Sequence, residues 1–581
     1  MRAKRGRRKT QKGGSTSRAR RKTLCFSKEF VMCASSLEPG RYIERGPQLW
    51  LLIAPSESSP ETTRQRVMPF RDPDPAEIYV NGRRLDEHLK HIGYGETRLI
   101  REVLRSLDWE VFRARYQRNG RPPYAPEAMM SGILFGLMKG LRSLRKLEYF
   151  FKTNHEVWWL TGGIAPDHAA LGRFVHMHAE SLSEDFFTML TSKILDVVGK
   201  KAGKKVTVLD GTVIAAAGSR LACRRVKKVV QIAEAARAAA DAAPDDKAAQ
   251  QAAEKAERVL AAGQARQKAR AAAGDSTDKL AKMRVCTTEP DAVILKSKTG
   301  QVEPAYIPSV LAGEDVYIVG QSVEQTDEKA AFPKVIKQAS AIGVEVEVVL
   351  ADGNYCKGDL LQHAVAEDIN VITPPDKASK SGRKKELEPL ASNTRNVVKQ
   401  DFTYKSESDT YTCPRGVSLY NSKESRTDKR RGSEADVYRP EPSTCDGCAF
   451  KARCKFSSRG VERQASEPYI EAMRDVLRQP QAQEIFARRG VIVEPCFSVL
   501  KCAMGIQRFH RFGYKSVQVE FALYVCAYNL IKMTRAVRRE RLKAARPSGA
   551  PSDSAGQREL LDMLMLAFML AAIVRLWLAH P

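Results

Sequence analysis

The segment that best predicts the fold of this chain is Val206-Thr-Val-Leu-Asp-Gly-Thr212. Its apolar, largely β-branched run predicts a buried strand that leads directly into Asp210. A second run of the same kind, Val344-Glu-Val-Glu-Val-Val-Leu-Ala-Asp-Gly353, predicts a strand that leads into Asp352. Strands alternating with helices predict an α/β core with a mixed sheet. Two further strands and a helical crossover are predicted at residues 316–319, 370–373 and 334–342.

Three acids stand in distinctive local settings. Asp210 and Asp352 are each followed by glycine, and Glu494 lies in Val491-Ile-Val-Glu-Pro-Cys-Phe497. Carboxylates at the ends of strands project beyond the sheet edge, where α/β proteins bind ligands. Such hard oxygen ligands suit Mg²⁺ or Mn²⁺, and two ions roughly 3.5–4 Å apart can activate a water or a 3′-hydroxyl and stabilise the leaving oxygen. A single strand-Asp-Gly is more often a structural turn, so the hypothesis requires folding to bring all three acids together.

The setting of Glu494 predicts its place in a helix. Pro495 disfavours helical geometry at the residue before it and suits a first helical turn, which predicts Glu494 as the N-cap of a helix that runs to Ala503. The helix dipole would then keep Glu494 ionised. Lys501 follows two turns later on the same face, where it could hold a DNA phosphate. A solvated lysine on a surface helix fits this spacing as well.

The charge balance favours a polyanionic partner. The chain of 581 residues carries 96 Lys and Arg against 68 Asp and Glu, a formal charge of +28. Part of the excess is a basic tail, but the remainder after residue 24 still carries +17. Nucleic acid is the first candidate for such a partner.

The helical pattern changes along the chain. Residues 68–200 carry apolar residues at helical spacing in three segments, with Ser143 and Asp167 as predicted caps of the second and third. This suits a helix-turn-helix-like DNA-binding domain, and a plain helical bundle fits equally. Residues 226–273 are Ala-rich and divided by Pro244, which predicts an inserted helical hairpin. A solvated spacer is its expected role, and contact of its charged faces with DNA is the alternative. The three segments are residues 128–140, 143–153 and 168–181.

These patterns predict the domain organisation. Residues 374–440 are polar and are predicted to be poor in strands, and helices are predicted at residues 467–489 and 516–533. Met68 is interpreted as the physiological start. The predicted parts are a basic tail (1–67), a helical DNA-binding domain (68–200), the first part of the α/β core with the hairpin (201–373, hairpin 226–273), a polar insertion with a cysteine cluster (374–466), the last part of the core (467–536) and a basic, Ser/Pro-rich tail with an apolar terminal helix (537–581).

The apolar C-terminal run is not predicted to cross a membrane. Residues 560–578 contain Asp562 and Arg575, which leave too short an apolar stretch to span a bilayer. A helix that packs on the protein or on a partner is expected instead. No secretory signal pattern is evident, so a reducing cytosol is the expected compartment.

Four of the twelve cysteines form a cluster, Cys413, Cys445, Cys448 and Cys454. The C-x₂-C pair and two further thiols suit a tetrahedral structural Zn²⁺ site. Because Cys413 is remote in sequence, four free cysteines remain the alternative.

A basic, aromatic segment, Gln507-Arg-Phe-His-Arg-Phe-Gly-Tyr-Lys515, follows the third acid. Arg508, Arg511 and Lys515 are predicted to contact DNA phosphates, with cations that merely line the surface as the alternative. Phe509 and Phe512 are predicted to be core residues.

Several ordered blocks of the sequence resemble a known family. Asp-Gly-Thr (210–212), Leu-Ala-Asp-Gly-Asn-Tyr (350–355) and Val-Glu-Pro-Cys-Phe (493–497) with Lys501 are similar to the three catalytic blocks of DDE transposases of bacterial insertion sequences. The likeness covers about residues 70–535 in the correct order. Further resembling blocks are Gly-Arg-Pro-Pro-Tyr (120–124), Leu-Arg-Ser-Leu-Arg-Lys-Leu-Glu (141–148), Pro-Asp-His (166–168) with Arg173-Phe174, Arg508-Phe509, Arg511-Phe512-Gly513 and Ala527-Tyr-Asn-Leu530.

The resemblance implies both fold and function. It implies an RNase H-like core in which Asp210, Asp352 and Glu494 hold two Mg²⁺ or Mn²⁺ ions. It also implies cleavage at the element's ends and transfer of the 3′-ends to target DNA. The N-terminal helices, with Arg145, Lys146 and Arg173, would bind the terminal inverted repeats, and a homodimer would act on paired ends. The expected location is the cytoplasm, at the bacterial nucleoid.

Two other functions remain open. The family usually has Val-Phe-Gly after Glu-Pro, where this chain has Cys496-Phe497-Ser498, and its second block usually reads Ala-Asp-Ala-Gly-Tyr, where this chain has Gly353-Asn354 before Tyr355. The chain could therefore be a catalytically inactive or domesticated DNA-binding protein with the same fold. A metal-dependent nuclease without strand transfer is the other alternative.

Overall fold

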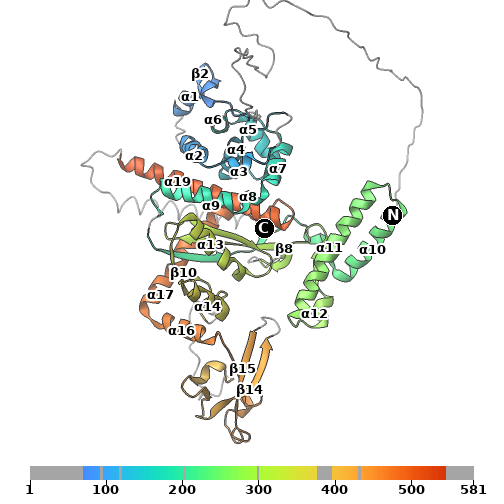
Figure 1. Cartoon of the computed structure of the whole chain (residues 1–581), viewed down its shortest axis with the longest axis vertical. Coiled ribbons are helices and arrows are strands. Elements are labelled where there is room, and N and C mark those ends of the chain that lie inside the picture. Colours follow the sequence, from blue (N-terminus) through green and yellow to red (C-terminus); the bar gives the residue numbers. More distant parts are fainter. Residues whose placement is uncertain are drawn as a thin grey trace, which may run out of the picture. The chain divides into compact units, whose positions relative to one another are not determined.

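The computed structural model describes residues 70–91, 96–116, 121–201, 203–297, 300–375, 396–428 and 433–544, all within one compact unit, Val67–Pro581 (Figure 1). The predicted basic tail (1–67), the start at Met68 and the apolar run 560–578 lie outside these residues.

The helical N-terminal part is built around α4 (Pro126–Met138), of which residues 126–137 are all buried. α5 (Leu144–Thr153) packs against α4 so closely that a Cβ on Gly132 would lie 2.1 Å from the Phe151 ring. The other helices of this part are α1 (Leu85–His91), α2 (Glu96–Arg105), α3 (Glu110–Arg113), α6 (His155–Thr161), α7 (His168–Met177), α8 (Ala179–Ser183) and α9 (Asp185–Val197), preceded by a small ladder of β1 (Tyr79–Val80) and β2 (Arg83–Arg84).

α4, α5 and α7 confirm the three helices predicted in this part. Asp167 caps α7 as predicted, because its carboxylate accepts a hydrogen bond from the Ala170 N–H at 2.6 Å. Ser143 occupies the N-cap of α5, but its side chain makes no capping hydrogen bond, so that part of the prediction is wrong.

The central sheet is mixed, as predicted. Its main strands are β3 (Lys205–Gly211), β8 (Val302–Gly313), β9 (Ile318–Glu324), β10 (Val346–Ala351) and β11 (Asn370–Ile372), side by side in the order β11-β10-β3-β8-β9. β3, β10 and β11 are mutually parallel, whereas β8 is antiparallel to both β3 and β9. The parallel arrangement brings the ends of β3 and β10, where the two predicted aspartates stand, to the same edge.

Of the five main strands of this sheet, β8 is the one that the sequence did not predict. It contains Pro304 and Pro308, which are rare inside strands because proline cannot donate to the ladder. Pro308 nevertheless takes part, since its carbonyl accepts a hydrogen bond from the Thr212 N–H at 2.9 Å. The amino-terminal half of β8 pairs with two short strands, β4 (Ile214–Ala215) and β7 (Val293–Lys296).

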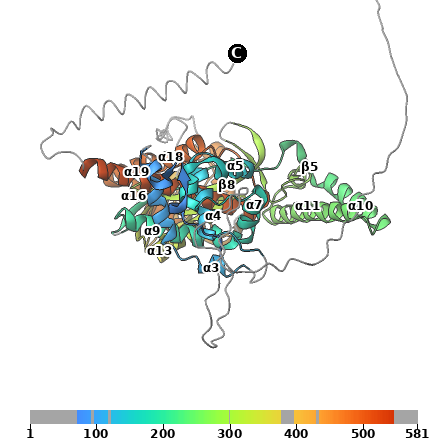
Figure 2. The ribbon, with the colours of Figure 1, turned by 90° about the horizontal axis from the view of Figure 1, so that it is seen from above.

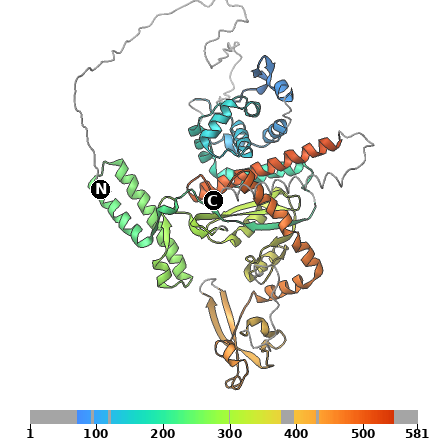
Figure 3. The ribbon, with the colours of Figure 1, turned by 180° about the vertical axis from the view of Figure 1, so that it is seen from behind.

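α19 (Tyr514–Ala544) joins the sheet to the helical part. It packs against α4, α8 and α9 and also against β9, so that both parts share one hydrophobic core (Figures 1 and 3). Asn529 of α19 is fully buried, and its amide both accepts from the Ile318 N–H at 3.1 Å and donates to the Ile318 carbonyl at 2.9 Å. α13 (Ala331–Ile342) is the predicted crossover helix, and it packs on β9.

The inserted hairpin forms as predicted. α10 (Val226–Ala242) and α11 (Lys247–Ala272) pack side by side, and Pro244 lies in the turn that connects them (Figure 2). A short helix, α12 (Thr277–Ala281), follows, and a ladder of β5 (Cys223–Arg225) and β6 (Arg284–Cys286) forms the neck of the insertion.

Residues 374–440 contradict the prediction of few strands. The described part of this region contains four strands of a five-stranded antiparallel sheet, which has the order β12-β13-β14-β15-β16. β14 is polar from Asn421 to Asp428, so most of it lacks the apolar alternation by which a strand is recognised. The strands are β12 (Thr403–Lys405), β13 (Thr410–Thr412), β14 (Ser418–Asp428), β15 (Ser433–Pro440) and β16 (Val461–Gln464).

The last part of the core returns to helices. The predicted helical stretch 467–489 is divided by Pro480 into two helices, and the predicted final helix is part of α19. The remaining helices are α14 (Gly358–Ala366), α15 (Phe456–Arg459), α16 (Glu467–Arg478), α17 (Pro480–Ala487), α18 (Arg489–Ser498) and a π-helical turn, η7 (Val499–Ala503).

Candidate active site

Asp210 and Asp352 lie at neighbouring strand ends. Leu209 of β3 pairs with Ala351 of β10, and each acid is the next residue along its parallel strand. The backbone register of the sheet therefore places both carboxylates at one edge. The Asp352 carboxylate accepts hydrogen bonds from the backbone N–H and the side-chain amide of Asn354, at 2.9 and 3.3 Å.

Glu328, which the sequence did not single out, is the third acid at this edge. It follows β9, just before α13, and a Cβ on Gly211 would lie 2.8 Å from its Oε2. The Asn354 amide donates to Glu328 Oε1 at 2.9 Å as well as to Asp352. Burial raises the pKa of Glu328, and the charges of Asp352 and Asp210 raise it further. We call Asp210, Asp352 and Glu328 the carboxylate cluster.

Arg489 is the cation of this site. It is the first residue of α18, and its guanidinium forms an ion pair with Asp210 at 2.9 Å. Both side chains are largely buried, with 22% of Arg489 and 18% of Asp210 exposed. The ion pair orients the Asp210 carboxylate. Neither Arg489 nor Glu328 lies in a motif that would have revealed its role from sequence.

The structure corrects the predicted setting of Glu494. α18 begins at Arg489, so Glu494 is an interior helical residue rather than an N-cap, and Pro495 lies inside the same helix. Burial of Ile492, Val493 and Cys496 holds the segment helical and outweighs the local preference of a residue before proline. The Glu494 side chain is exposed.

Lys501 lies at the carboxyl end of the same segment, in η7, and its ammonium donates a hydrogen bond to the Thr212 hydroxyl. α18 and η7 therefore contact the end of β3 at two points, through Arg489 and through Lys501. Glu494 lies between these two residues. Among the described residues, no group of three or more His, Cys, Asp or Glu side chains has the arrangement of a metal site.

The basic, aromatic segment is largely occupied by contacts within the protein. Arg508 donates to the Ala216 carbonyl at 2.6 Å and pairs with Glu303. The backbone N–H of Arg511 donates to the buried Glu520, and burial lowers the pKa of Arg511. Lys515 is exposed.

The two phenylalanines of this segment differ in how deeply they are buried. Phe509 is fully buried, as predicted, but the Phe512 side chain is 57% exposed, so its assignment to the core is wrong. After Phe512, the backbone N–H groups of Gly513 and Tyr514 donate hydrogen bonds to the carboxylates of Glu289 and Asp291. These bonds fix the backbone but leave the Phe512 ring exposed.

The basic residues of the helical part lie on its surface. Arg145 and Lys146 of α5 line a hollow together with Lys139 and Tyr149, and the Tyr149 ring is 69% exposed. Arg173 of α7 is also exposed. An aromatic ring among cations is a surface that suits nucleic acid, and Tyr149 was not singled out in the sequence.

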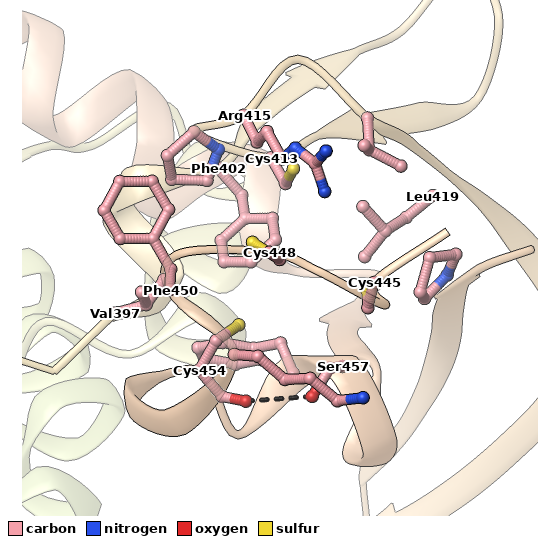
Figure 4. A pocket seen from close by; sticks show the side chains of 15 residues that line it. Val397, Phe402, Cys413, Arg415, Leu419, Cys445, Cys448, Phe450, Cys454 and Ser457 are labelled. Atoms are coloured by element: carbon pink, nitrogen blue, oxygen red, sulfur yellow. Dashed lines mark hydrogen bonds between the residues drawn. The ribbon is translucent and has the colours of Figure 1, made fainter. Parts of the chain in front are cut away.

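The four clustered cysteines line one pocket beside the sheet β12–β16, in the segments between its strands (Figure 4). Phe402, Phe450 and Phe456 surround them, and burial together with the neighbouring thiols raises the pKa of Cys445. We call Cys413, Cys445, Cys448 and Cys454 the cysteine pocket. The structure brings the four thiols into one place without the geometry of a bound metal.

Comparison with known proteins identifies two segments of the chain. A family model described as a transposase DDE domain matches residues 412–534, and a second, described as a transposase domain (DUF772), matches residues 87–177. No curated protein matches the chain. The first segment contains Glu494, Lys501 and the cysteine pocket, and the second contains Arg145, Lys146 and Arg173.

These matches agree with the fold. A DDE domain implies an RNase H-like core, and the chain has a mixed sheet of β11-β10-β3-β8-β9 with a crossover helix before β10. Within the described ranges, no helix is both long enough and apolar enough to cross a membrane. Together, the two matches indicate a DDE-type transposase of an insertion sequence.

Proposed function

We propose that the chain binds the terminal inverted repeats of its element, cleaves the DNA there and joins the freed 3′-ends to target DNA. The observation that carries this proposal is the pairing of β3 with β10, which sets Asp210 and Asp352 side by side at one sheet edge. Glu494, on the helix that packs across the end of β3, supplies the third catalytic carboxylate.

The residues at this edge fit a divalent cation. The carboxylates of Asp210, Asp352 and Glu328 supply hard oxygen donors, which divalent cations prefer. Burial and the charges of Asp352 and Asp210 raise the pKa of Glu328, and a bound cation would offset both effects. Bound Mg²⁺ or Mn²⁺ would activate the attacking oxygen and stabilise the leaving oxygen. Asn354 orients Asp352 and Glu328, and Arg489 orients Asp210.

DNA contacts would come from two surfaces. Arg145, Lys146 and Tyr149 on α5, with Arg173 on α7, form the surface proposed for the inverted repeats. Lys501, which contacts Thr212 at the end of β3, and the exposed Lys515, which follows it in sequence, are proposed to contact DNA phosphates near the candidate active site. Arg508 and Arg511 mainly make contacts within the protein that hold residues 507–515 in place. The chain would act as a homodimer on paired ends, on DNA of the bacterial nucleoid.

Zinc is proposed for the cysteine pocket. Four thiols lining one pocket match the donor set of a structural zinc site, and a bound cation would offset the raised pKa of Cys445. Because four thiolates leave no open coordination position, such an ion would stabilise the sheet β12–β16 rather than take part in catalysis.

The test uses the full chain with duplexes that contain the DNA flanking the gene. In Mg²⁺ or Mn²⁺, the wild type is expected to cleave at the element ends and to form joined products with a target plasmid. Asp210→Ala and Glu494→Ala are each expected to reduce both reactions about 10³-fold, since a metal ligand contributes several kcal/mol to the transition state. Both variants should still shift the end-containing duplex in a binding assay.

Two results would overturn the proposal. A wild type that binds the ends but never nicks them in Mn²⁺ would be an inactive DNA-binding protein. Hydrolysed ends without joined products would instead identify a nuclease that lacks strand transfer.

A further inference from the structure

The neck of the hairpin insertion sets two cysteines directly opposite each other. Cys223 is the first residue of β5, Cys286 is the last residue of β6, and the two are paired across this antiparallel ladder. Both thiols are free. The DNA chemistry proposed above uses neither of them.

The ladder fixes how close the two cysteines lie. The Thr287 N–H donates to the Ala222 carbonyl at 3.1 Å, and the Val226 N–H donates to the Met283 carbonyl at 3.2 Å. Hydrogen-bonded pairs alternate with non-hydrogen-bonded pairs along such a ladder, so the pair of Cys223 and Cys286 is non-hydrogen-bonded. Residues at such positions have Cα atoms about 4.5 Å apart, which lies within the range that a disulfide requires.

The two sulfur atoms also point to one place. The Cys223 thiol donates to the Ser219 carbonyl at 3.8 Å, and the Cys286 thiol donates to the same oxygen at 3.6 Å. A Cβ on Gly218 would lie 2.9 Å from Cys286 Sγ, so glycine at this position leaves the space that the sulfur occupies. The thiols therefore converge on one side of the ladder.

We propose that Cys223 and Cys286 form an oxidisable dithiol that low-molecular-weight disulfides convert into an intrachain disulfide. In the first step the Cys223 thiolate attacks the small disulfide, forms a mixed disulfide and releases one small thiolate. Cys286 then attacks the Cys223 sulfur of the mixed disulfide, and the second small thiolate leaves. The protein loses two electrons and two protons, and the small disulfide gains them as two thiols.

The order of the two steps follows from burial. Cys223 is partly exposed, whereas Cys286 is buried, so Cys223 meets the oxidant. Burial raises the pKa of Cys223 to about 11, with a further contribution from Cys286 and an opposing one from Arg284 and Arg224. Because the thiolate is scarce at neutral pH, the reaction is slow and needs sustained oxidant.

The disulfide would close the neck of the insertion. On the other side of the ladder, Val285 packs with Val229 and Val259 of the hairpin. On the core side, Arg508 donates to the carbonyls of Ala216 and Gly218, just before β5. A covalent bond at the neck would thus tie the base of the hairpin beside the segment that Arg508 anchors.

The experiment incubates the full chain in buffers of graded ratios of oxidised to reduced glutathione. Free thiols are then alkylated under denaturing conditions, and digested peptides are mapped by mass spectrometry. The expected result is a linked peptide pair containing Cys223 and Cys286, smaller by two hydrogen atoms than the reduced pair. Exchange of the Thr287 N–H with deuterium should also slow on oxidation.

Matched variants separate this pair from the other thiols. Cys223→Ser, at a partly exposed position, should abolish the linked peptide and leave Cys286 free of glutathione. Cys502→Ser, at an exposed cysteine elsewhere in the chain, should leave the linked peptide unchanged. A glutathione adduct on Cys223 without the link would overturn the proposal. Complete alkylation of both cysteines at every ratio would overturn it too, and circular dichroism establishes that each variant is folded.

Discussion

The carboxylate cluster and the cysteine pocket are both groups of side chains that we propose to bind metal ions, but different parts of the backbone hold them. Asp210 and Asp352 stand at the ends of two paired strands within the large hydrophobic core, so the sheet register sets their separation. The cysteines lie in and beside loops of a smaller sheet whose core is a few aromatic and aliphatic residues. The comparison teaches that the fold preorganises the first group, whereas the second, under the proposed zinc binding, would gain its order from a bound ion.

The largest expected effect tests that dependence on an ion. A chelator should remove zinc from the cysteine pocket and destabilise the sheet β12–β16, because structural zinc contributes on the order of 10 kcal/mol of binding free energy. Zinc content and the hydrogen exchange of the β14 and β15 amides measure this, with the amides of α4 as the internal control. A purified chain that holds no zinc, and whose amides are not protected by added zinc, would refute the zinc site.

The next largest effect is expected on DNA cleavage when a preorganised carboxylate is removed. Asp352→Asn is expected to lower DNA cleavage about 10³-fold with little change in melting temperature, because the strands and not the carboxylate hold the site. Glu347→Gln is the control, since Glu347 is exposed on the same strand. A large loss of stability in Asp352→Asn would break the comparison, as it would show that the carboxylate helps to hold the fold.

A smaller effect is expected from Glu328→Gln. Loss of a carboxylate that supports the metal ligands should lower cleavage and Mn²⁺ affinity by about 10- to 100-fold. The raised pKa of Glu328 means that its contribution to stability is full at pH values below the ordinary carboxyl pKa and is lost as the pH rises through the raised pKa.

The pH dependence of Glu328 can be measured by urea unfolding in EDTA. The wild type should lose stability relative to Glu328→Gln as the pH rises from the acidic range towards neutrality. Equal pH dependence in the two proteins would show that Glu328 is not held against the aspartates.

The smallest effect concerns the cation of the site. Arg489→Gln removes the ion pair with Asp210 and should lower cleavage about tenfold, equivalent to about 1.4 kcal/mol. Arg488→Gln is a matched control, because the neighbouring arginine pairs with Glu314 near the surface and should leave cleavage unchanged. Equal losses in the two variants would assign the effect to helix α18 as a whole.

Much of the core could be predicted from local pattern. Apolar, β-branched runs located β3 and β10 with their terminal acids, and alanine-rich composition with Pro244 located the hairpin. The pattern failed where tertiary contacts outweigh local preference. β8 contains two prolines, and β14 is polar from Asn421 to Asp428. Glu494 precedes a proline within a helix that buried neighbours hold in place.

The sequence by itself determined the strands that carry Asp210 and Asp352, because each aspartate directly follows the apolar run that forms its strand. Only the tertiary structure decided which groups surround those aspartates. Glu328 reaches them from the start of α13 and Arg489 from the start of α18, and neither lies in a pattern of its own. The physical reason is that the register between distant segments follows from packing of the whole core, and no local run of residues encodes it.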